Sequence, residues 1–171
     1  MMRIGCHLIL GLILLGLETT VIPELSIGIT FYNLLIPFVI YFSLFRRIGT
    51  GLTVVLLVGF AADVLSGAPN GIYMGTFLAL WLIFRNIGGY FQAGPLLLFT
   101  LVTAAGVGIE NLVFFACLAV SEMAALFSMN NLQLLLIQIL LVFLTAPLIY
   151  RLLAAYFDWL DTFAGAVGAK S

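Results

Sequence analysis

Charged residues are scarce in this chain, and their scarcity excludes whole classes of protein. Only 8% of its 171 residues are Asp, Glu, Lys or Arg, whereas 64% are hydrophobic. In soluble domains about a quarter of the residues are charged. The formal net charge of -1 also leaves no basic surface of the kind that nucleic acid requires. The composition therefore predicts a polytopic membrane protein that does not bind nucleic acid.

Residues suited to catalysis are equally few. The single histidine, His7, and the two cysteines, Cys6 and Cys117, suggest no zinc cluster, no thiol and imidazole pair and no Ser-His-Asp set. The cysteines fall near opposite ends of their predicted helices, so we expect buried thiols rather than a disulfide. The glycines are not spaced as a phosphate-binding loop. We therefore expect no catalytic residue, no metal site, no cofactor and no enzymatic activity.

Long apolar runs fill nearly the whole chain. A helix needs about 20 apolar residues to cross a hydrocarbon core of about 30 Å. The sequence predicts a single all-α membrane domain with six transmembrane helices, over residues 4–22, 27–45, 48–65, 71–84, 95–120 and 132–155. The first is expected to be a retained helix, because no cleavage site follows it. Pro37 and Pro147 interrupt the second and sixth helices and should kink them.

The few basic residues orient these helices. With six spans and both termini in the cytoplasm, every basic residue lies at a cytoplasmic end or tail, as the positive-inside rule requires. These residues are Arg3, Arg46, Arg47, Arg85, Arg151 and Lys170. A five-span arrangement would divide them between the two faces and would draw Asp63 through lipid. After Arg151 the sequence predicts a last helical turn at the membrane interface and then a frayed end.

The turn between the third and fourth helices combines a carboxylate, Asp63, with Ser66 and several small residues. The small residues recur every four positions from this turn down the fourth helix, at Gly67, Gly71, Gly75 and Ala79. Such a stripe lets another helix approach closely. A carboxylate at bilayer depth is a candidate functional group, although Asp63 could instead cap the fourth helix by accepting backbone N–H bonds.

Three carboxylates are predicted at one depth. Glu18, Asp63 and Glu110 lie 14, 15 and 15 residues beyond the starts of their helices, which is roughly 21 to 23 Å from the cytoplasmic surface. Asn33 comes to nearly the same level, and Asn111 follows Glu110. No basic residue is predicted there, so the layer must be hydrated in an outward cavity, protonated, or paired with another chain. Glu18 could also lie at the membrane interface.

Residues 59–85 resemble a known family. The run over residues 59–73, followed by an apolar helix that ends near Arg85, is similar to the bacterial rod shape-determining protein MreD family. The overall length, the short loops and the basic cytoplasmic ends also look like that family. The positions that the resemblance covers are Asp63, Ser66, Gly67 and Gly71; it does not extend to Glu18, Glu110 or Asn111.

The resemblance implies a non-enzymatic component of the cell-elongation machinery in the bacterial inner membrane. Proteins of this kind work beside the bitopic protein MreC, the MreB filament, and the wall synthases RodA and penicillin-binding protein 2. Their fold is similar to the substrate-binding subunits of energy-coupling-factor transporters, which are six-helix bundles with an outward cavity.

Two functions therefore remain open. In the favoured one, a scaffold, the small-residue stripe and the polar layer receive helices or periplasmic segments of an MreC-like protein and of the synthases. In the other, Glu18, Asp63, Glu110 and Asn33 line an outward cavity of a transporter subunit and bind a small cationic or polyhydroxylated molecule. The first helix lacks an obvious Ala-x-x-x-Ala face for docking a coupling module, and this weakens the transporter hypothesis.

Overall fold

The chain is helical nearly throughout the part that the structure describes. This computed structural model describes residues 2–21, 32–66, 71–87, 94–120 and 129–168. A π-helical turn, η1 (Leu17–Val21), continues the first helix, α1 (Met2–Gly16). The other helices are α3 (Leu35–Phe45), α4 (Ile48–Ser66), α5 (Ile72–Ile87), α6 (Pro95–Val120) and α7 (Met129–Gly168). No strand occurs within these ranges, so the all-α prediction is confirmed for them.

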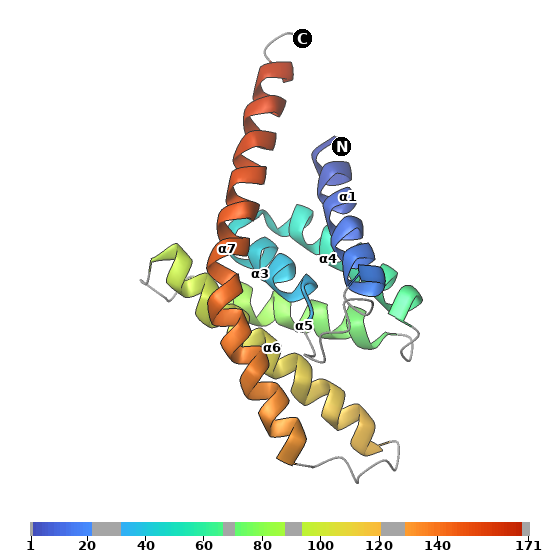
Figure 1. The fold of residues 1–171 in the computed structure, drawn as a ribbon. Coiled ribbons are helices and arrows are strands. Elements are labelled where there is room, and N and C mark those ends of the chain that lie inside the picture. The colour runs from blue at the N-terminus through green and yellow to red at the C-terminus, as the bar shows by residue number, and fades with distance from the viewer. Residues whose placement is uncertain (1, 22–31, 67–70, 88–93, 121–128, 169–171) are drawn as a thin grey trace.

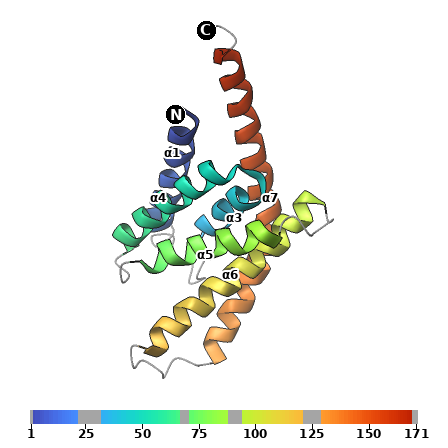
Figure 2. The same ribbon diagram turned by 180° about the vertical axis from the view of Figure 1, so that it is seen from behind.

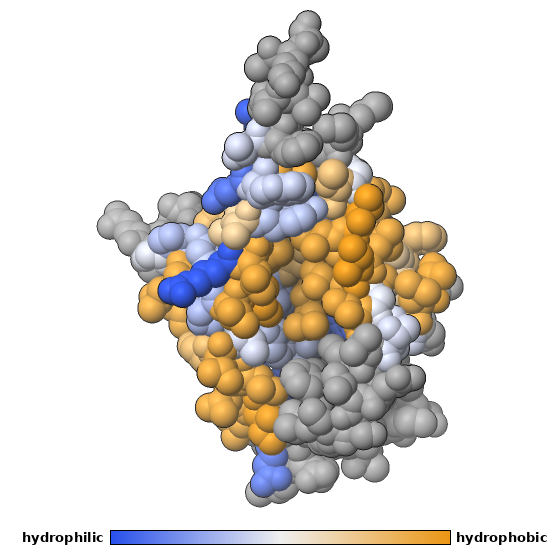
Figure 3. Space-filling view, turned by 45° about the horizontal axis from the view of Figure 1, so that its top comes forward, coloured by the Kyte–Doolittle hydropathy of each residue, from blue (hydrophilic) through white to orange (hydrophobic). Residues whose placement is uncertain are grey.

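Three helical segments are long and apolar enough to cross a membrane: Ile48–Ser66, Pro95–Val113 and Leu135–Leu160. The helices over Gly5–Thr20, Leu35–Phe45 and Ile72–Asn86 are apolar but shorter. Hydrophobic residues also cover most of the middle of the face shown in Figure 3. Helices and a surface of this kind are typical of a membrane protein.

The helix α3 is shorter than the sequence predicts. The expected span begins at residue 27, but Tyr32 and Asn33 are not helical and α3 starts only at Leu35, while residues 27–31 lie outside the described ranges. Its 11 residues extend about 16 Å, roughly half of a bilayer core. Pro37 consequently lies in the first turn, where its missing N–H breaks no helical hydrogen bond. The prediction that Pro37 kinks a long helix is therefore wrong.

The short helix α3 lies at the centre of the molecule. Every residue from Leu35 to Ser43 is buried, and α1, α4, α5, α6 and α7 all contact it. A helix that is apolar on every side is stable only when other elements surround it. Here α4 packs along α5 and α6 packs along α7, and together with α1 these two pairs enclose α3 (Figures 1 and 2).

The N-terminal end of α1 and the C-terminal end of α7 lie on the same side of the molecule (Figure 1). At the C-terminal ends of α3 and α5, Nη1 of Arg85 donates a hydrogen bond of 2.6 Å to the carbonyl oxygen of Arg46, so two of the predicted cytoplasmic residues lie together. A chain that crosses a membrane an even number of times has its first and last helix ends on the same side. However, α4 and α5 run across α7 rather than parallel to it in both views (Figures 1 and 2).

The helix α7 is longer than the sequence predicts. The expected span ends near Ala155 and frays soon afterwards, but α7 continues to Gly168. Its 40 residues extend about 60 Å, twice the thickness of a hydrocarbon core. Pro147 lies inside the helix, and α7 bends near its middle, in agreement with the predicted kink (Figures 1 and 2).

Candidate functional site

Asp63 stands at the corner between α4 and α5. Its side chain is buried, and its two carboxylate oxygens accept hydrogen bonds from the backbone N–H groups of Tyr73 and Met74, at 2.8 and 3.1 Å. These N–H groups belong to the first turn of α5 and have no acceptor within that helix. Gly71, just before α5, has a φ of 98°, a conformation that favours glycine. Asp63 therefore caps α5.

A buried hydrogen bond joins α6 to the start of α3. Nδ2 of Asn33 donates to Oε1 of Glu110 at 2.7 Å, and both side chains are buried. The side-chain oxygen of Asn33 accepts the N–H of Leu35 at 2.8 Å, and its carbonyl oxygen accepts the N–H of Ile36 at 3.2 Å. Because α3 begins in the interior, its first N–H groups need such acceptors. Glu110 thus lies beside a helix N-terminus, where the helix dipole favours negative charge.

Glu18 reaches the same helix start from α1. It lies in η1, and a widened π-helical turn of this type occurs often at functional sites. Its carboxyl group lies against the backbone N–H groups of Leu34 and Leu35, and it is close enough to Glu110 for their charges to interact. Its Oε2 is buried and has no hydrogen-bond partner within the described ranges. We call Glu18, Asn33 and Glu110 the carboxylate cluster.

Tyr73 connects the carboxylate cluster to the corner at Asp63. Its phenol group lies within electrostatic range of Glu18, Asp63 and Glu110. The structure thus gathers three residues of the predicted polar layer, Glu18, Asn33 and Glu110, in direct or charge contact. Asp63 is not part of this group, because its carboxylate accepts hydrogen bonds from the first turn of α5.

Among the described residues, no basic side chain acts on the carboxyl groups of the carboxylate cluster. The groups that act on Glu18 and Glu110 in the described chain are each other, Asn33, and the backbone N–H groups of Leu34 and Leu35. The carboxyl groups of Glu18 and Glu110 repel each other when both are ionised, so the cluster favours binding of one positive charge, as a proton or a cation. Within the described ranges, no three or more His, Cys, Asp and Glu side chains are grouped to hold a metal ion.

Asn111 does not belong to the carboxylate cluster. Its Nδ2 donates to the carbonyl oxygen of Val107 at 2.8 Å and to Oε1 of Gln138 on α7 at 2.9 Å. The side chain of Gln138 is buried, so this amide pair ties α6 to α7 in the interior. The sequence analysis missed Gln138, although an amide inside a long apolar run was a usable signal.

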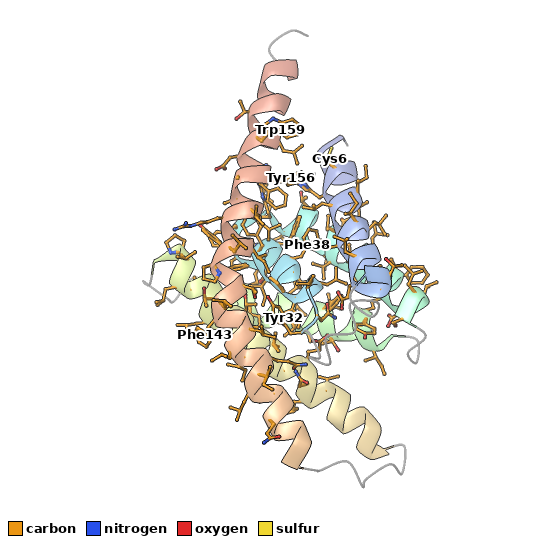
Figure 4. The ribbon with its side chains drawn as sticks, viewed as in Figure 1. Cys6, Tyr32, Phe38, Phe143, Tyr156 and Trp159 are labelled. Atoms are coloured by element: carbon orange, nitrogen blue, oxygen red, sulfur yellow. The ribbon has the colours of Figure 1, made fainter. Side chains whose placement is uncertain are left out.

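A second contact with α7 was also missed. The hydroxyl of Tyr32 and Oγ1 of Thr145 are hydrogen-bonded, and Thr145 gives its own proton to the carbonyl oxygen of Leu141 at 2.7 Å. Since a hydroxyl has one proton to donate, Tyr32 is the donor in the first bond. Figure 4 shows Tyr32 in the middle of the molecule, next to α7. This bond fixes the residue before Asn33 and therefore helps to fix the start of α3.

The predicted small-residue stripe faces outward. Gly75 and Ala79 are exposed, and a Cβ atom built on Gly71 or Gly75 would meet no atom within 4 Å. Ser66 is exposed at the end of α4, and Gly67 lies outside the described residues. Other glycines make the close helix contacts inside the molecule: a Cβ would lie between 2.6 and 2.9 Å from a neighbouring atom at Gly11, Gly51, Gly59 and Gly106.

Comparisons of the chain with protein-family models, with curated proteins and with solved structures give no match. The geometry of the chain and the resemblance of residues 59–85 are therefore the grounds for assigning a function.

Proposed function

We propose that this protein is a non-enzymatic scaffold of the bacterial cell-elongation complex. It would cross the cytoplasmic membrane six times with both termini inside, and bind an MreC-like bitopic protein directly and MreB, RodA and penicillin-binding protein 2 through it. The apolar helices, the N-terminal end of α1 and the C-terminal end of α7 on one side, and the resemblance over residues 59–85 support this proposal.

The observation that carries the proposal is the exposed stripe on α5. Gly75 and Ala79 lie one helical turn apart on a face that no other described helix covers, and the space above Gly75 is open. In lipid, helices associate through close packing, and small residues allow it. The molecule uses glycine for this purpose between its own helices at Gly59, where a Cβ would lie 2.9 Å from Cα of Met74. The stripe on α5 offers the same type of contact to another chain.

The test is co-purification of the MreC-like protein with a Gly75→Leu variant. Because the site is open, leucine should leave the fold intact while blocking the approach of a partner helix. We expect at least a tenfold loss of the co-purified partner and rounded cells. Gly108→Leu is the matched control, since a Cβ on Gly108 of α6 also meets no atom within 4 Å. Unchanged recovery of the partner and normal rods in the Gly75→Leu strain would contradict the proposal.

One observation favours the transporter hypothesis as a second candidate. The N-terminus of α3 lies in the interior beside the buried carboxyl group of Glu110, as the ends of half-helices do at the ion and substrate sites of transporters. The same purification distinguishes the two functions. Recovery of a transporter ATPase instead of an MreC-like protein would favour the transporter subunit.

A further inference from the structure

A cavity of about 350 Å³ lies between α1, α3 and α7. Its walls carry apolar side chains from all three helices: Leu10 and Leu14 of α1, Phe38 of α3, and Ile149, Leu152 and Leu153 of α7. Phe38 and Leu153 are only 1% and 6% exposed, whereas Leu152 is 62% exposed. The cavity is therefore a groove with a buried floor and an open side, and Figure 4 shows Phe38 between α1 and α7.

Hydrogen bonds between side chains and neighbouring elements bound the groove along α7. At one end the hydroxyl of Tyr156, which also lines the groove, donates a hydrogen bond of 3.2 Å to the carbonyl oxygen of Cys6 on α1 (Figure 4). At the other end Thr145, one helical turn before Ile149, is hydrogen-bonded to Tyr32. The hydroxyl protons at both ends are therefore already donated, and an occupant of the groove meets hydrocarbon on its walls.

The open side of the groove is continuous with the surface that faces lipid. The α7 residues of its walls lie within Leu135–Leu160, a segment long and apolar enough to cross a membrane. Next to the groove, α1 exposes Ile9 and Ile13, and α7 exposes Leu148. Exposed apolar side chains on a membrane-spanning helix lie against lipid tails, which are as apolar as leucine. A lipid chain can therefore enter the groove from the side without leaving its apolar surroundings.

The size of the groove limits what it can hold. A helix is about 10–12 Å across with its side chains, so two turns of a partner helix would occupy on the order of 1,000 Å³. That is about three times the volume of this groove. An apolar cavity of about 150 Å³ holds a benzene molecule, so a volume of about 350 Å³ has room for roughly a dozen carbon atoms. This volume fits a large part of one hydrocarbon chain.

We propose that the groove holds one acyl chain of a membrane phospholipid, which enters from the side between α1 and α7 and packs on Phe38. An empty groove would deprive its walls of packing contacts, and water would find too few polar partners there. Among the described helices, α1 packs most extensively on α4, and the acyl chain fills the space that separates it from α7. The head group stays in the surrounding lipid. Since the stripe on α5 lies on another helix, this site is independent of partner binding there.

The test uses the full-length protein in nanodiscs of a phosphatidylcholine that carries a photoreactive diazirine midway along one acyl chain. After irradiation, the labelled residues are mapped by mass spectrometry. Lipid that only surrounds the protein reaches exposed side chains but not Phe38. We expect Phe38 to be labelled about fivefold more than Phe42, which lies one turn further along α3, is fully buried and does not line the groove. Labelling confined to exposed residues, or equal labelling of Phe38 and Phe42, would overturn the proposal.

A variant that fills the groove tests its role directly. Ile149→Trp should occupy the groove and reduce the labelling of Phe38 about fivefold. Leu148→Trp is the matched control, because Leu148 is the neighbouring residue on α7, is exposed and does not line the groove. Undiminished labelling of Phe38 in Ile149→Trp would contradict the proposal. The comparison of Phe38 with Phe42 in the unaltered protein decides the question even if a variant fails to fold.

Native mass spectrometry of the protein, purified in a mild detergent, identifies the occupant. We expect an added mass of one phospholipid on the unaltered protein and on Leu148→Trp, and its loss from Ile149→Trp. A bound isoprenoid quinone, or a dimer of the chain that Ile149→Trp dissociates, would show that something other than a phospholipid chain fills the groove and would overturn the proposal.

Discussion

Both carboxylate oxygens of Asp63 accept hydrogen bonds from the first turn of α5. From the sequence, this carboxylate could equally be a cap or a group that faces a partner. The structure decides for the cap, because the turn brings two N–H groups without helical acceptors to within 3.1 Å of it. This aspartate therefore holds the corner between α4 and α5.

We expect Asp63→Ala to destabilise the protein by about 1–2 kcal/mol, the usual cost of losing a helix cap. Asp63→Asn keeps one oxygen as an acceptor, so its stability should lie between that of Asp63→Ala and that of the unaltered protein. Thermal unfolding in detergent, followed by circular dichroism, measures both. Identical unfolding curves for Asp63→Ala and the unaltered protein would show that the cap is unimportant.

The position of a residue along its helix predicts its depth in the membrane, but not its hydrogen-bond partners, as the carboxylate cluster illustrates. Counting residues from the helix starts predicted Glu18, Asn33, Asp63 and Glu110 at one level; in the structure Asn33 donates a hydrogen bond to Glu110, and Glu18 lies within range of its charge. The same arithmetic gave no hydrogen-bond partners. Asn111 pairs with Gln138 on α7 instead of joining the cluster, because the side of α6 on which a residue lies decides its partner.

At the scale of the helix, the glycines divide into two groups that the sequence does not distinguish. At Gly59 a Cβ would lie 2.9 Å from Cα of Met74, so α4 and α5 touch through their backbones. At Gly75 and Gly108 the corresponding space is open. A spacing of four residues indicates a face on which helices can approach closely, but it does not say whether the second helix belongs to the same chain.

We expect Gly59→Ala to destabilise the protein by about 1–3 kcal/mol, because the added methyl group must push a backbone atom rather than a flexible side chain. Gly108→Ala is the matched control. It replaces a helical glycine, and the added methyl group enters open space, so this variant should be more stable than the unaltered protein by about 0.5–1 kcal/mol. Thermal unfolding midpoints of the two variants in the same detergent make the comparison. Equal midpoints would mean that α4 and α5 are not in close contact at Gly59.

At the scale of the whole molecule, α3 determines the arrangement. It is too short to cross a bilayer core and is buried on every side, so the other helices pack around it rather than in a row of parallel spans. Two of the basic residues, Arg46 and Arg85, lie together at one end of α3 and α5. The six-span topology with both termini inside stays a prediction that labelling can test.

We expect cysteines placed at Gly49 and Asn86 to be labelled by a membrane-impermeant maleimide only after the cells are permeabilised. Both positions are exposed at ends predicted to be cytoplasmic. Cysteines at Asn70 and Glu122, in the predicted periplasmic turns, should react in intact spheroplasts. The background is the chain without its own two cysteines. Labelling of all four positions from one side would contradict the six-span topology.

The sequence by itself determined the helical class, the apolar character, the α4–α5 turn and the start of α6, because each depends on composition or on residues that are neighbours along the chain. Only the tertiary structure decided that α3 starts at Leu35, that Asp63 caps α5, and that Gly59 is inside while Gly75 is outside. These features depend on which atoms lie opposite a residue in space. In a chain that is 64% hydrophobic, nearly every helix face is apolar, so periodicity alone does not tell an inner face from a lipid-facing one.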